Sequence, residues 1–503
     1  MSLPEWLDPL FAADEMQAAD AWAIDEQGVP SLDLMERAGT GLARLTARVA
    51  RQGRIRVVVG KGNNGGDGLV VARLLREEGR DVDVLALGPL EELRGDPAAN
   101  LERLPGASPE PFEPEKLEDS GAVVDAILGT GFEGEVREPA RGAVAAMNEG
   151  DAPVVACDVP TGVNASTGEV EGEAVRATAT GTFHGSKLGL HLAPGAFHAG
   201  EVEVVEIGIP RGAPEPGSAG LISERVLDRF PRRTREGTKF TSGVVVIVGG
   251  SLGLTGAPAL AALAAARAGA GYVQVAVPGS VQPAMDMRLL EQMSQGLPDE
   301  DGAHVPEGAE QVAELAKRAG ALVLGPGLGR SEGAAELARR VAREVHVPLL
   351  VDADGLNAHA GHLDGLRERE SPAVLTPHAG ELGRLLEIDS DEVSAHRLAH
   401  AREAAARSGC VVLLKGDDTL VALPEGEVAV NPGGTPALAT AGTGDVLSGL
   451  IGTLLAKGLG PFEAASLGAF AHVRAGDASA RRFGADHVLA GDVIECLPKG
   501  LGD

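Results

Sequence analysis

Apolar, β-branched runs alternate with helical patterns along this chain, which restricts the folds it can adopt. In the first half the runs are "IRVVV" from Ile55, "DVDVLAL" from Asp81, "GAVVDAIL" up to Leu128, "APVVACD" up to Asp158 and "EVEVVEI" from Glu201. Helices are expected between them near Ser31, after Asp67, near Leu93 and near Ala140. This alternation predicts a parallel sheet covered by helices, with ligands bound at the carboxyl ends of the strands.

A second series of such runs begins with "GVVVIVGG" at Gly243 and continues through "GYVQVAVP", "ALVLGPG", "VPLLVDADG", "PAVLTPHAGE" and "CVVLLKG". Between the two series, "RGAPEPGSAG" from Arg211 is rich in Pro and Gly and lacks periodicity, as a linker does. The chain has 503 residues, more than the roughly 250–300 that one hydrophobic core supports. We predict two three-layer α/β/α domains, at 1–212 and 223–503, joined by a linker at 213–222. Each is expected to fold separately.

Charge and cysteine usage exclude several classes of protein. The formal net charge of −29 disfavours a nucleic-acid partner. No run is long and apolar enough to span a bilayer, and the acidic N-terminus does not resemble a signal peptide. Cys157, Cys410 and Cys496 are few, odd in number and far apart, which favours reduced thiols in the cytoplasm over disulfides or a zinc site.

The glycine-rich stretch "GKGNNGGDG" follows the Ile55 strand. It satisfies G-x-G-x-x-G, but the next strand ends in Gly88, where a dinucleotide-binding fold places a ribose-binding acid. A phosphate-gripping P-loop needs its lysine at the end of the loop, whereas Lys61 comes at the beginning. The side-chain amides of Asn63 and Asn64 and the carboxylate of Asp67 instead suit a polar ligand or a hard cation.

Polar residues also follow neighbouring strands of the first half. Asn64 follows the Ile55 strand, Asp125 lies near the end of "GAVVDAIL", and Asp158 with Thr161 ends "APVVACDVPT". Since the carboxyl ends of parallel strands meet at one edge, these side chains can converge. For any one of them, a helix cap or a turn is an equally good explanation; three strand ends together favour a site.

In the second half, the run Ala441-Gly442-Thr443-Gly444-Asp445 precedes an apolar pattern of helical length. Its amides therefore lie at a helix N-terminus, where they stabilise charge on a transferring phosphoryl group. Asp445 would stand beside the phosphate and accept a proton from an attacking hydroxyl. An aspartate here is often only a helix cap, but the surrounding glycines and the "LLKGDDT" loop with Lys415 favour a catalytic role.

The first half resembles the NAD(P)H-hydrate epimerase domain over residues 10–210, through "GKGNNGGDGLVVAR", "DAILGTGF", "DVPTGVNASTG" and "TFHGSKLGLHLAPG". The resemblance implies a Rossmann-like fold and a K⁺ ion held by Asn64, Asp125 and Thr161. It also implies a set of residues that contact the hydrated dinucleotide: Asn63, Asn64, Gly65, Gly66, Asp67, Gly129, Thr130, Gly131, Phe132, Glu133 and Asp158.

The residue types suit epimerisation. Carbon 6 of the hydrated ring carries a hydroxyl and is bonded to nitrogen, so reversible proton transfers that open and reclose this centre invert it. Asp158, with Lys187 as a partner, can supply the acid and the base; Lys187 is alternatively a solvated or phosphate-pairing group.

The second half is similar to the ribokinase-like fold and, within it, to the ADP/ATP-dependent NAD(P)H-hydrate dehydratases over about residues 225–500. The resemblance lies in "GGSLGLTGAPALAALAAARAGAGYV", "LGPGLG", "VDADGLN", "LTPHAGE", "LKGDDTLV" and "GTPALATAGTGDVLSG". It implies contacts to the hydrate from Ala257, Gly327, His378 and Asp445, and to ADP or ATP with Mg²⁺ from Lys415, Gly416, Thr419, Ala441, Gly442, Thr443 and Gly444. His378 is alternatively a structural loop histidine, and Leu254 replaces an aromatic residue of related chains.

The implied reaction begins when Asp445 deprotonates the ring 6-hydroxyl. The nucleotide phosphorylates that oxygen, and phosphate then leaves. We expect a bifunctional, cytoplasmic, homo-oligomeric repair enzyme (isomerase and lyase) acting on NADHX and NADPHX, without nucleic-acid or membrane partners. Two alternatives stay open: a small-molecule kinase of the hydroxymethylpyrimidine or thiazole type, and a first domain that only binds a dinucleotide and regulates the second.

Overall fold

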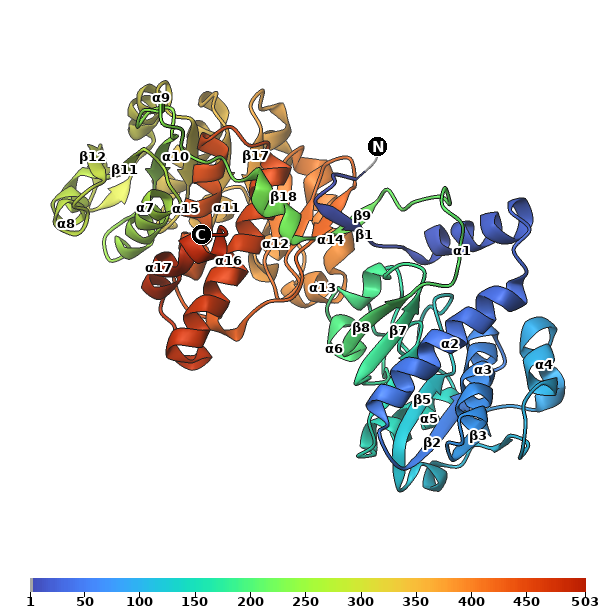
Figure 1. The fold of residues 1–503 in the computed structure, drawn as a ribbon. Helices are drawn as coiled ribbons and strands as arrows, with labels where there is room; N and C mark the ends of the chain where they lie inside the picture. Colours follow the sequence, from blue (N-terminus) through green and yellow to red (C-terminus); the bar gives the residue numbers. More distant parts are fainter. Residues whose placement is uncertain (1–2) are drawn as a thin grey trace. The chain divides into compact units, whose positions relative to one another are not determined.

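The chain forms two compact units in a computed structural model that describes residues 3–503. The first unit contains Pro9–Ala219, and the second contains Pro4–Asp8 together with Gly220–Asp503. Figure 1 shows both, coloured along the sequence.

The first unit is built on a parallel sheet. Within residues 9–219 its order is β4-β3-β2-β5-β6-β7-β8, and every pair in it is parallel. Its strands are β2 (Arg54–Val59), β3 (Val82–Ala86), β4 (Glu110–Pro111), β5 (Ser120–Ala126), β6 (Val154–Cys157), β7 (Ala179–Phe183) and β8 (Glu201–Val205). Because the order reverses at β2, the unit has the switch point at which Rossmann-like folds bind ligands.

Helices cover both faces of this sheet. They are α1 (Ala13–Ala21), α2 (Ser31–Val49), α3 (Asn63–Glu77), α4 (Gly95–Glu102), α5 (Ala140–Glu149) and α6 (Ala196–Ala199), and α1 runs on into the π-helical turn η1 (Trp22–Glu26). On β2, Ile55, Val57 and Val59 belong to the hydrophobic cluster of α2 and α3, whereas Val58 packs in the cluster of α5. Successive side chains of a strand point to opposite faces, so the three-layer prediction is confirmed for this unit.

The second unit contains a larger mixed sheet of order β1-β9-β20-β19-β18-β17-β16-β15-β10-β11-β12. From β12 to β18 the neighbours are parallel, whereas β18, β19 and β20 are antiparallel. The strands are β1 (Leu7–Pro9), β9 (Ala219–Ile222), β10 (Val244–Val248), β11 (Tyr272–Pro278), β12 (Met293–Leu297), β15 (Ala321–Leu324), β16 (Leu349–Val351), β17 (Ala373–Leu375), β18 (Val411–Leu414), β19 (Leu420–Ala422) and β20 (Val428–Val430). A small separate hairpin pairs β13 (Asp299–Glu300) with β14 (Ala303–His304).

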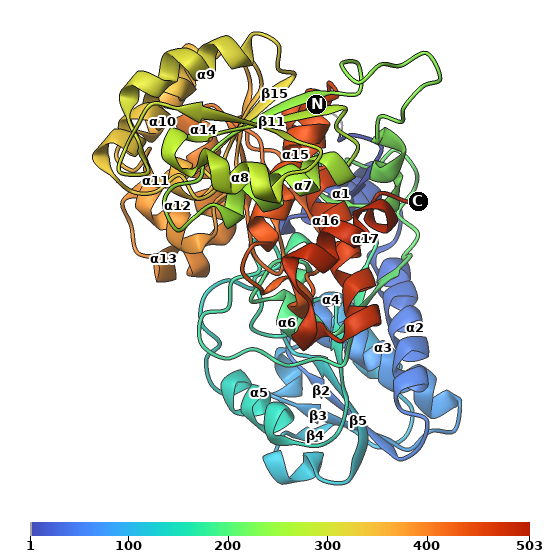
Figure 2. The same ribbon diagram turned by 90° about the vertical axis from the view of Figure 1, so that its left-hand side faces the viewer.

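The helices of the second unit form two groups. The first group is α7 (Gly256–Arg267), α15 (Thr443–Ala456), α16 (Pro461–Phe483) and α17 (Ala490–Gly500), which contact one another. The others are α8 (Gln282–Arg288), α9 (Ala309–Ala316), α10 (Glu332–Glu344), α11 (Asp354–Asn357), α12 (Ala379–Leu386), α13 (Ser390–Ala395) and α14 (Arg397–Ser408). In Figure 2 the first group is light green and red, and α9 to α14 are yellow to orange. Every residue of β10 is buried, as expected for a strand covered on both faces.

None of the helices within residues 3–503 combines the length and the apolar character needed to cross a membrane.

The segment Pro4–Asp8 belongs to the second unit, whereas the sequence prediction assigned residues 1–212 to the first domain and 223–503 to the second. Strand β1 is hydrogen-bonded beside β9 in the larger sheet. The Ser223 amide donates to the Trp6 carbonyl over 3.0 Å, and the Trp6 ring lies 5.6 Å from that of Phe462 on α16. The short N-terminal strand is only three residues long and lacks alternation, so the sequence pattern did not reveal it. The expected separate folding of the two halves stays a prediction.

Trp6→Ala is expected to destabilise the second unit by about 3–5 kcal/mol, because a buried indole is removed. The measurement is the denaturant midpoint for loss of that unit's helical signal or activity. Leu290→Ala serves as the control, since Leu290 is 91% exposed and should change stability by at most about 0.5 kcal/mol. A Trp6 variant as stable as the Leu290 variant would show that the N-terminal strand contributes nothing to the second unit.

Candidate active sites

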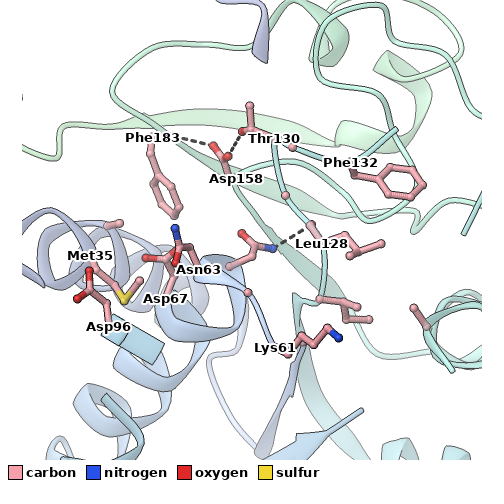
Figure 3. A pocket seen from close by; sticks show the side chains of 18 of the residues that line it. Met35, Lys61, Asn63, Asp67, Asp96, Leu128, Thr130, Phe132, Asp158 and Phe183 are labelled. Carbon is pink, nitrogen blue, oxygen red and sulfur yellow. Dashed lines mark hydrogen bonds between the residues drawn. The ribbon is translucent and has the colours of Figure 1, made fainter. Parts of the chain in front are cut away.

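A pocket of about 1150 Å³ opens in the first unit where β2, β5 and β6 end. Figure 3 shows side chains from the turns after these strands pointing into it. The predicted residues that line it are Asn63, Asn64, Asp67, Gly129, Thr130, Gly131, Phe132, Glu133 and Asp158. The turns predicted to hold the dinucleotide therefore do meet at one cavity.

Gly65 and Gly66 do not line the pocket. Helix α3 begins at Asn63, so the predicted loop is its first turn, with Gly62 as the N-cap. A methyl group on Gly65 would lie 2.1 Å from the Gly60 carbonyl oxygen, and one on Gly66 would lie 2.7 Å from the sulfur of Met35. Because these glycines have no side chains, the first turn of α3 packs closely against Gly60 and Met35. Asn63, not the glycines, then lies at the cavity.

The three residues predicted to hold K⁺ lie together. The Asp125 carboxylate is fully buried and accepts hydrogen bonds from Thr161 Oγ1 (2.7 Å) and the Thr161 amide (2.8 Å). Asn64 Nδ2 donates to the Leu128 carbonyl over 2.9 Å, and the Leu128 amide donates to Thr161 Oγ1 over 3.1 Å. Burial raises the pKa of Asp125 to about 6, although its hydrogen bonds with Thr161 and Ile127 oppose that rise.

Asp158 and Lys187 form a buried ion pair at the inner end of the pocket. Lys187 Nζ lies 2.7 Å from Asp158 Oδ1 and also donates to the Phe183 carbonyl over 2.7 Å. The same carboxylate accepts from the hydroxyls of Thr130 and Thr182 and from the Phe183 amide. Burial alone would raise the pKa of Asp158, but the charge and hydrogen bonds of Lys187, followed by Thr130 and Phe183, hold it below its ordinary value.

Backbone strain marks the same residue. Asp158 has φ 64°, in the left-handed region that costs a non-glycine residue free energy. Its amide donates to the Gly181 carbonyl over 2.8 Å, which holds the turn after β6 against β7. The chain therefore fixes this carboxylate rigidly opposite Lys187.

In the second unit, three carboxylates gather around the ammonium group of Lys415. Lys415 Nζ lies 2.9 Å from Asp352 Oδ1, after β16, and 3.6 Å from Glu381 Oε2, on α12. Ser448 Oγ donates to the other Asp352 oxygen over 2.7 Å. Burial would lower the pKa of Lys415, but Asp352, then Glu381 and Asp445, raise it above its ordinary value. The predicted lysine therefore stays charged.

Asp445 stands in the first turn of α15. The helix N-cap is Gly442, with φ 93°, a conformation that suits glycine, and no side chain makes a capping hydrogen bond there. A methyl group on Gly444 would lie 3.7 Å from Lys415 Nζ, so the two predicted nucleotide loops meet. Burial and then Asp352 raise the pKa of Asp445 to about 7, against the lowering effect of Lys415. No hydrogen bond therefore supports the alternative that Asp445 is only a helix cap.

The residues predicted to contact the hydrate in this unit come from separate elements. A methyl group on Gly327 would lie 3.3 Å from the Ala257 side chain of α7, so these two are neighbours. His378 has a structural role as the N-cap of α12, where Nδ1 accepts from the amides of Gly380 (3.0 Å) and Glu381 (3.3 Å). Because Nδ1 is an acceptor, Nε2 carries the hydrogen, and it lies 3.6 Å from Glu381 Oε1.

Comparison with known proteins decides the family. Residues 31–189 match the family described as YjeF-related protein N-terminus, and residues 245–499 match NAD(P)H-hydrate dehydratase. A protein of Salinibacter ruber named bifunctional NAD(P)H-hydrate repair enzyme Nnr is 42% identical over 527 residues, which cover 98% of this chain and 96% of that protein. The chain belongs to the bifunctional NAD(P)H-hydrate repair enzymes. A member from Moorella thermoacetica is 41% identical and covers 97% of the chain and 96% of its own length.

A solved structure is also similar to the dehydratase half of this family. It is an ADP/ATP-dependent NAD(P)H-hydrate dehydratase from Bacillus subtilis co-crystallised with ATP/Mg²⁺, with 29% identity and a TM-score of 0.48, covering 55% of this chain and 95% of that one. Family membership confirms the sequence resemblance and the fold prediction, Rossmann-like in the first unit and ribokinase-like in the second.

Lys187, predicted either as the partner of Asp158 or as a solvated or phosphate-pairing group, is fully buried beside Asp158. Three carboxylates of the two sites were not predicted. Asp20 on α1 also lines the pocket, and Asp352 and Glu381 hold Lys415. Asp352 follows a strand in "VDADGLN", so the strand-end rule applied to the first half would have found it. Asp20 had no such signal, because it lies before the first strand of its sheet.

Proposed function

We propose that this member of the family repairs hydrated NADH and NADPH in two steps. The first unit interconverts the R and S hydrates (NADHX and NADPHX), and the second dehydrates the S form at the expense of ADP or ATP. The observation that carries the dehydratase assignment is Asp445 beside Lys415 at the N-terminus of α15. A cytoplasmic location and self-association into a homo-oligomer remain predictions.

In the dehydratase unit, Asp445 accepts the proton of the ring 6-hydroxyl. The amides that begin α15 and the ammonium of Lys415 then stabilise charge on the phosphoryl group as it moves to that oxygen. Gly416, Thr419, Ala441, Gly442, Thr443 and Gly444 contribute the remaining nucleotide contacts. Phosphate, a better leaving group than hydroxide, departs from carbon 6, and carbon 5 loses a proton to solvent, so that the double bond between these carbons of the dihydronicotinamide ring is restored.

Mg²⁺ suits this site as a companion of the nucleotide. Proteins usually hold Mg²⁺ through substrate phosphates and one or two carboxylates. Over residues 3–503 no cluster of three or more His, Cys, Asp or Glu side chains is arranged to hold a metal ion by itself. We therefore assign the ion to the phosphates, with Asp352, Glu381 and Asp445 as the nearest carboxylates.

In the epimerase unit, the hydrated ring is placed against Asp158 and Lys187, with its ribose and phosphates along the turn 129–133 and the start of α3. Lys187, paired with Asp158 over 2.7 Å, faces the reacting centre. K⁺ fits the buried Asp125, which accepts hydrogen bonds from the neutral donors of Thr161 and Ile127 and, within residues 3–503, takes part in no ion pair with a protein cation. Held by Asn64, Asp125 and Thr161, it would neutralise Asp125 and fix the adjoining turns.

Asp125→Ala is expected to weaken hydrate binding to the epimerase and to abolish any dependence of epimerisation on K⁺, because the anionic ligand of a hard cation is lost. Epimerisation of the variant and the parent should be compared in K⁺ and in tetramethylammonium salts. Dehydration of the S hydrate in the same protein is the control, since it takes place in the other unit. Equal epimerisation by the parent in both salts would contradict the K⁺ assignment.

The proposed function is tested by adding the purified protein to NADH hydrate with ADP and following the return of reduced-nicotinamide absorbance. Supplying the R and S forms separately asks whether the first unit is an enzyme or only a binding module. Family membership over almost the whole chain favours repair over the kinase alternative, which would instead phosphorylate an alcohol without any gain in that absorbance.

A further inference from the structure

Asp158 has little capacity left to accept a proton. Its Oδ1 is engaged by Lys187, by Thr182 and by the Phe183 amide, and its Oδ2 by the hydroxyl of Thr130. A carboxylate with this many donors is stabilised in its charged form. Figure 3 shows it held at the side of the pocket by Thr130 and Phe183. Its geometry is that of a group which holds Lys187 in place.

A second carboxylate in the same pocket is differently placed. Asp20 lines the cavity from α1, together with Met16 and Gln17 one turn earlier. Among residues 3–503, the Asp20 carboxylate has no hydrogen-bond or ion-pair partner. The charges of Lys187 and Asp158 act on Asp20, and the charge of Asp20 in turn helps to raise the pKa of Asp67 on α3. Asp20 is therefore an unoccupied acceptor within range of the Asp158–Lys187 pair.

The local backbone supports a role for this position. Helix α1 ends at Ala21 and continues directly as the π-helical turn η1, from which Ile24 also lines the pocket. Single π-helical turns are rare and often occur at functional sites. An unpaired, half-buried carboxylate at such a turn costs stability, and the structure offers no packing reason for it.

We propose that Asp20 is the general base of the epimerase, and that Asp158 is a positioning residue which holds Lys187 as the acid. This inference rests on the proposed epimerisation. Asp20 takes the proton of the ring 6-hydroxyl while the bond between carbon 6 and the ring nitrogen breaks. The hydroxyl oxygen becomes the carbonyl oxygen of an aldehyde, and the nitrogen takes a proton from the Lys187 ammonium.

Rotation about the bond between carbons 5 and 6 then presents the other face of the aldehyde. The ring nitrogen attacks that face, returns its proton to Lys187, and the oxygen regains its proton from Asp20. Each atom and proton is restored, so the two epimers interconvert without a co-reactant. Burial, opposed by Lys187 and reinforced by Asp158, raises the pKa of Asp20 to about 6, which leaves it ionised yet basic near neutral pH.

The test uses the full chain without nucleotide, so that the dehydratase is silent, and follows interconversion of the R and S hydrates by chromatography. Asp20→Asn is expected to lower kcat on the order of 10²–10⁴-fold with little change in KM. Asp20→Glu should recover part of the loss. Asp25→Asn is the matched control, because Asp25 lies in the adjoining turn but is exposed and outside the pocket lining.

The pH profile separates the two carboxylates. The parent's kcat should rise with pH as Asp20 loses its proton, and this acidic limb should vanish in Asp20→Asn but persist in the residual activity of Asp158→Asn. A limb that persists in Asp20→Asn would overturn the inference, as would a kcat within about threefold of the parent, far from the loss of a base, or an effect on KM alone.

Separate control measurements report on folding and on function. Dehydration of S hydrate with ADP by the same preparations reports on the second unit, and the melting temperature of Asp20→Asn should equal or exceed that of the parent because a buried charge is removed. If the unmutated chain fails to interconvert the epimers, the proposed epimerase function fails; normal epimerisation by Asp20→Asn overturns only the assignment of Asp20.

Discussion

Asp445→Asn is expected to lower dehydration of the S hydrate on the order of 10²–10⁴-fold, because it removes the proton acceptor but keeps the size of the side chain. Nucleotide affinity should persist, since the amides of α15 and Lys415 remain. Epimerisation should continue at the parent rate, because that chemistry belongs to the first unit. The measurement is ADP-dependent recovery of NADH absorbance from purified S hydrate.

A matched control exists in the same unit. Asp492 at the start of α17 does cap its helix, through a 2.9 Å hydrogen bond from the Leu489 amide. Asp492→Asn should therefore cost at most about 1 kcal/mol of stability and leave turnover nearly unchanged. If Asp445→Asn behaves like Asp492→Asn, with dehydration within about threefold of the parent rather than the loss expected for a base, Asp445 is not the base.

The pH dependence gives a second check on Asp445. Its pKa is raised from 3.8 to about 7, so dehydration should increase as pH rises through 7 and the carboxylate loses its proton. The folded chain also binds this proton more tightly than the unfolded chain. Stability consequently falls as pH rises between these two values, and Asp445→Asn should not lower the melting temperature at pH 8.

Lys187→Met is expected to abolish epimerisation and to destabilise the first unit by about 3–5 kcal/mol, because the Asp158 carboxylate is left buried without its partner. Lys187 and Asp158 side chains are 1% and 12% exposed, so solvent cannot compensate. Denaturant unfolding of the first unit measures the stability change, and interconversion of the R and S hydrates measures the activity.

The double variant Lys187→Met/Asp158→Asn separates the structural from the chemical loss. Removing both charges should restore most of the stability, yet epimerisation should stay absent. For comparison, Arg48→Met breaks an exposed ion pair with Glu203 and should cost no more than about 1 kcal/mol. A Lys187→Met variant that retains both stability and activity would show that the buried pair has neither role.

The sequence predicted the central strands of both sheets because each is a run of β-branched residues between turn residues. Strands β2, β3, β5 and β6 lie where expected, and so do β10, β11 and β15 to β18. The strand-end rule also brought Asn64, Asp125 and Asp158 to the edge of one sheet. These predictions rest on local patterns, which a single sequence reports well.

What the sequence did not reveal depends on contacts between distant residues. Strand β7, "ATGTF", is buried throughout but contains Thr and Gly instead of a β-branched apolar run. The edge strands β1 and β12 and the short inner strand β20 also lack a distinctive pattern. Lys187 could not be recognised as buried, because its burial depends on the ion pair with Asp158, which follows another strand of the sheet. Asp20 enters the pocket from a helix that precedes the sheet.

The N-terminal strand has a consequence for synthesis on the ribosome. Strand β1 ends at Pro9, and its partner β9 begins only at Ala219. At about 5–20 residues per second, the ribosome needs roughly 10–40 s to make the intervening chain. During that time the first unit can complete its own fold, while the segment around Trp6 still lacks its sheet. The order of segments along the chain thus places the epimerase unit between two strands of the dehydratase sheet, and the epimerase unit can fold before that sheet is complete.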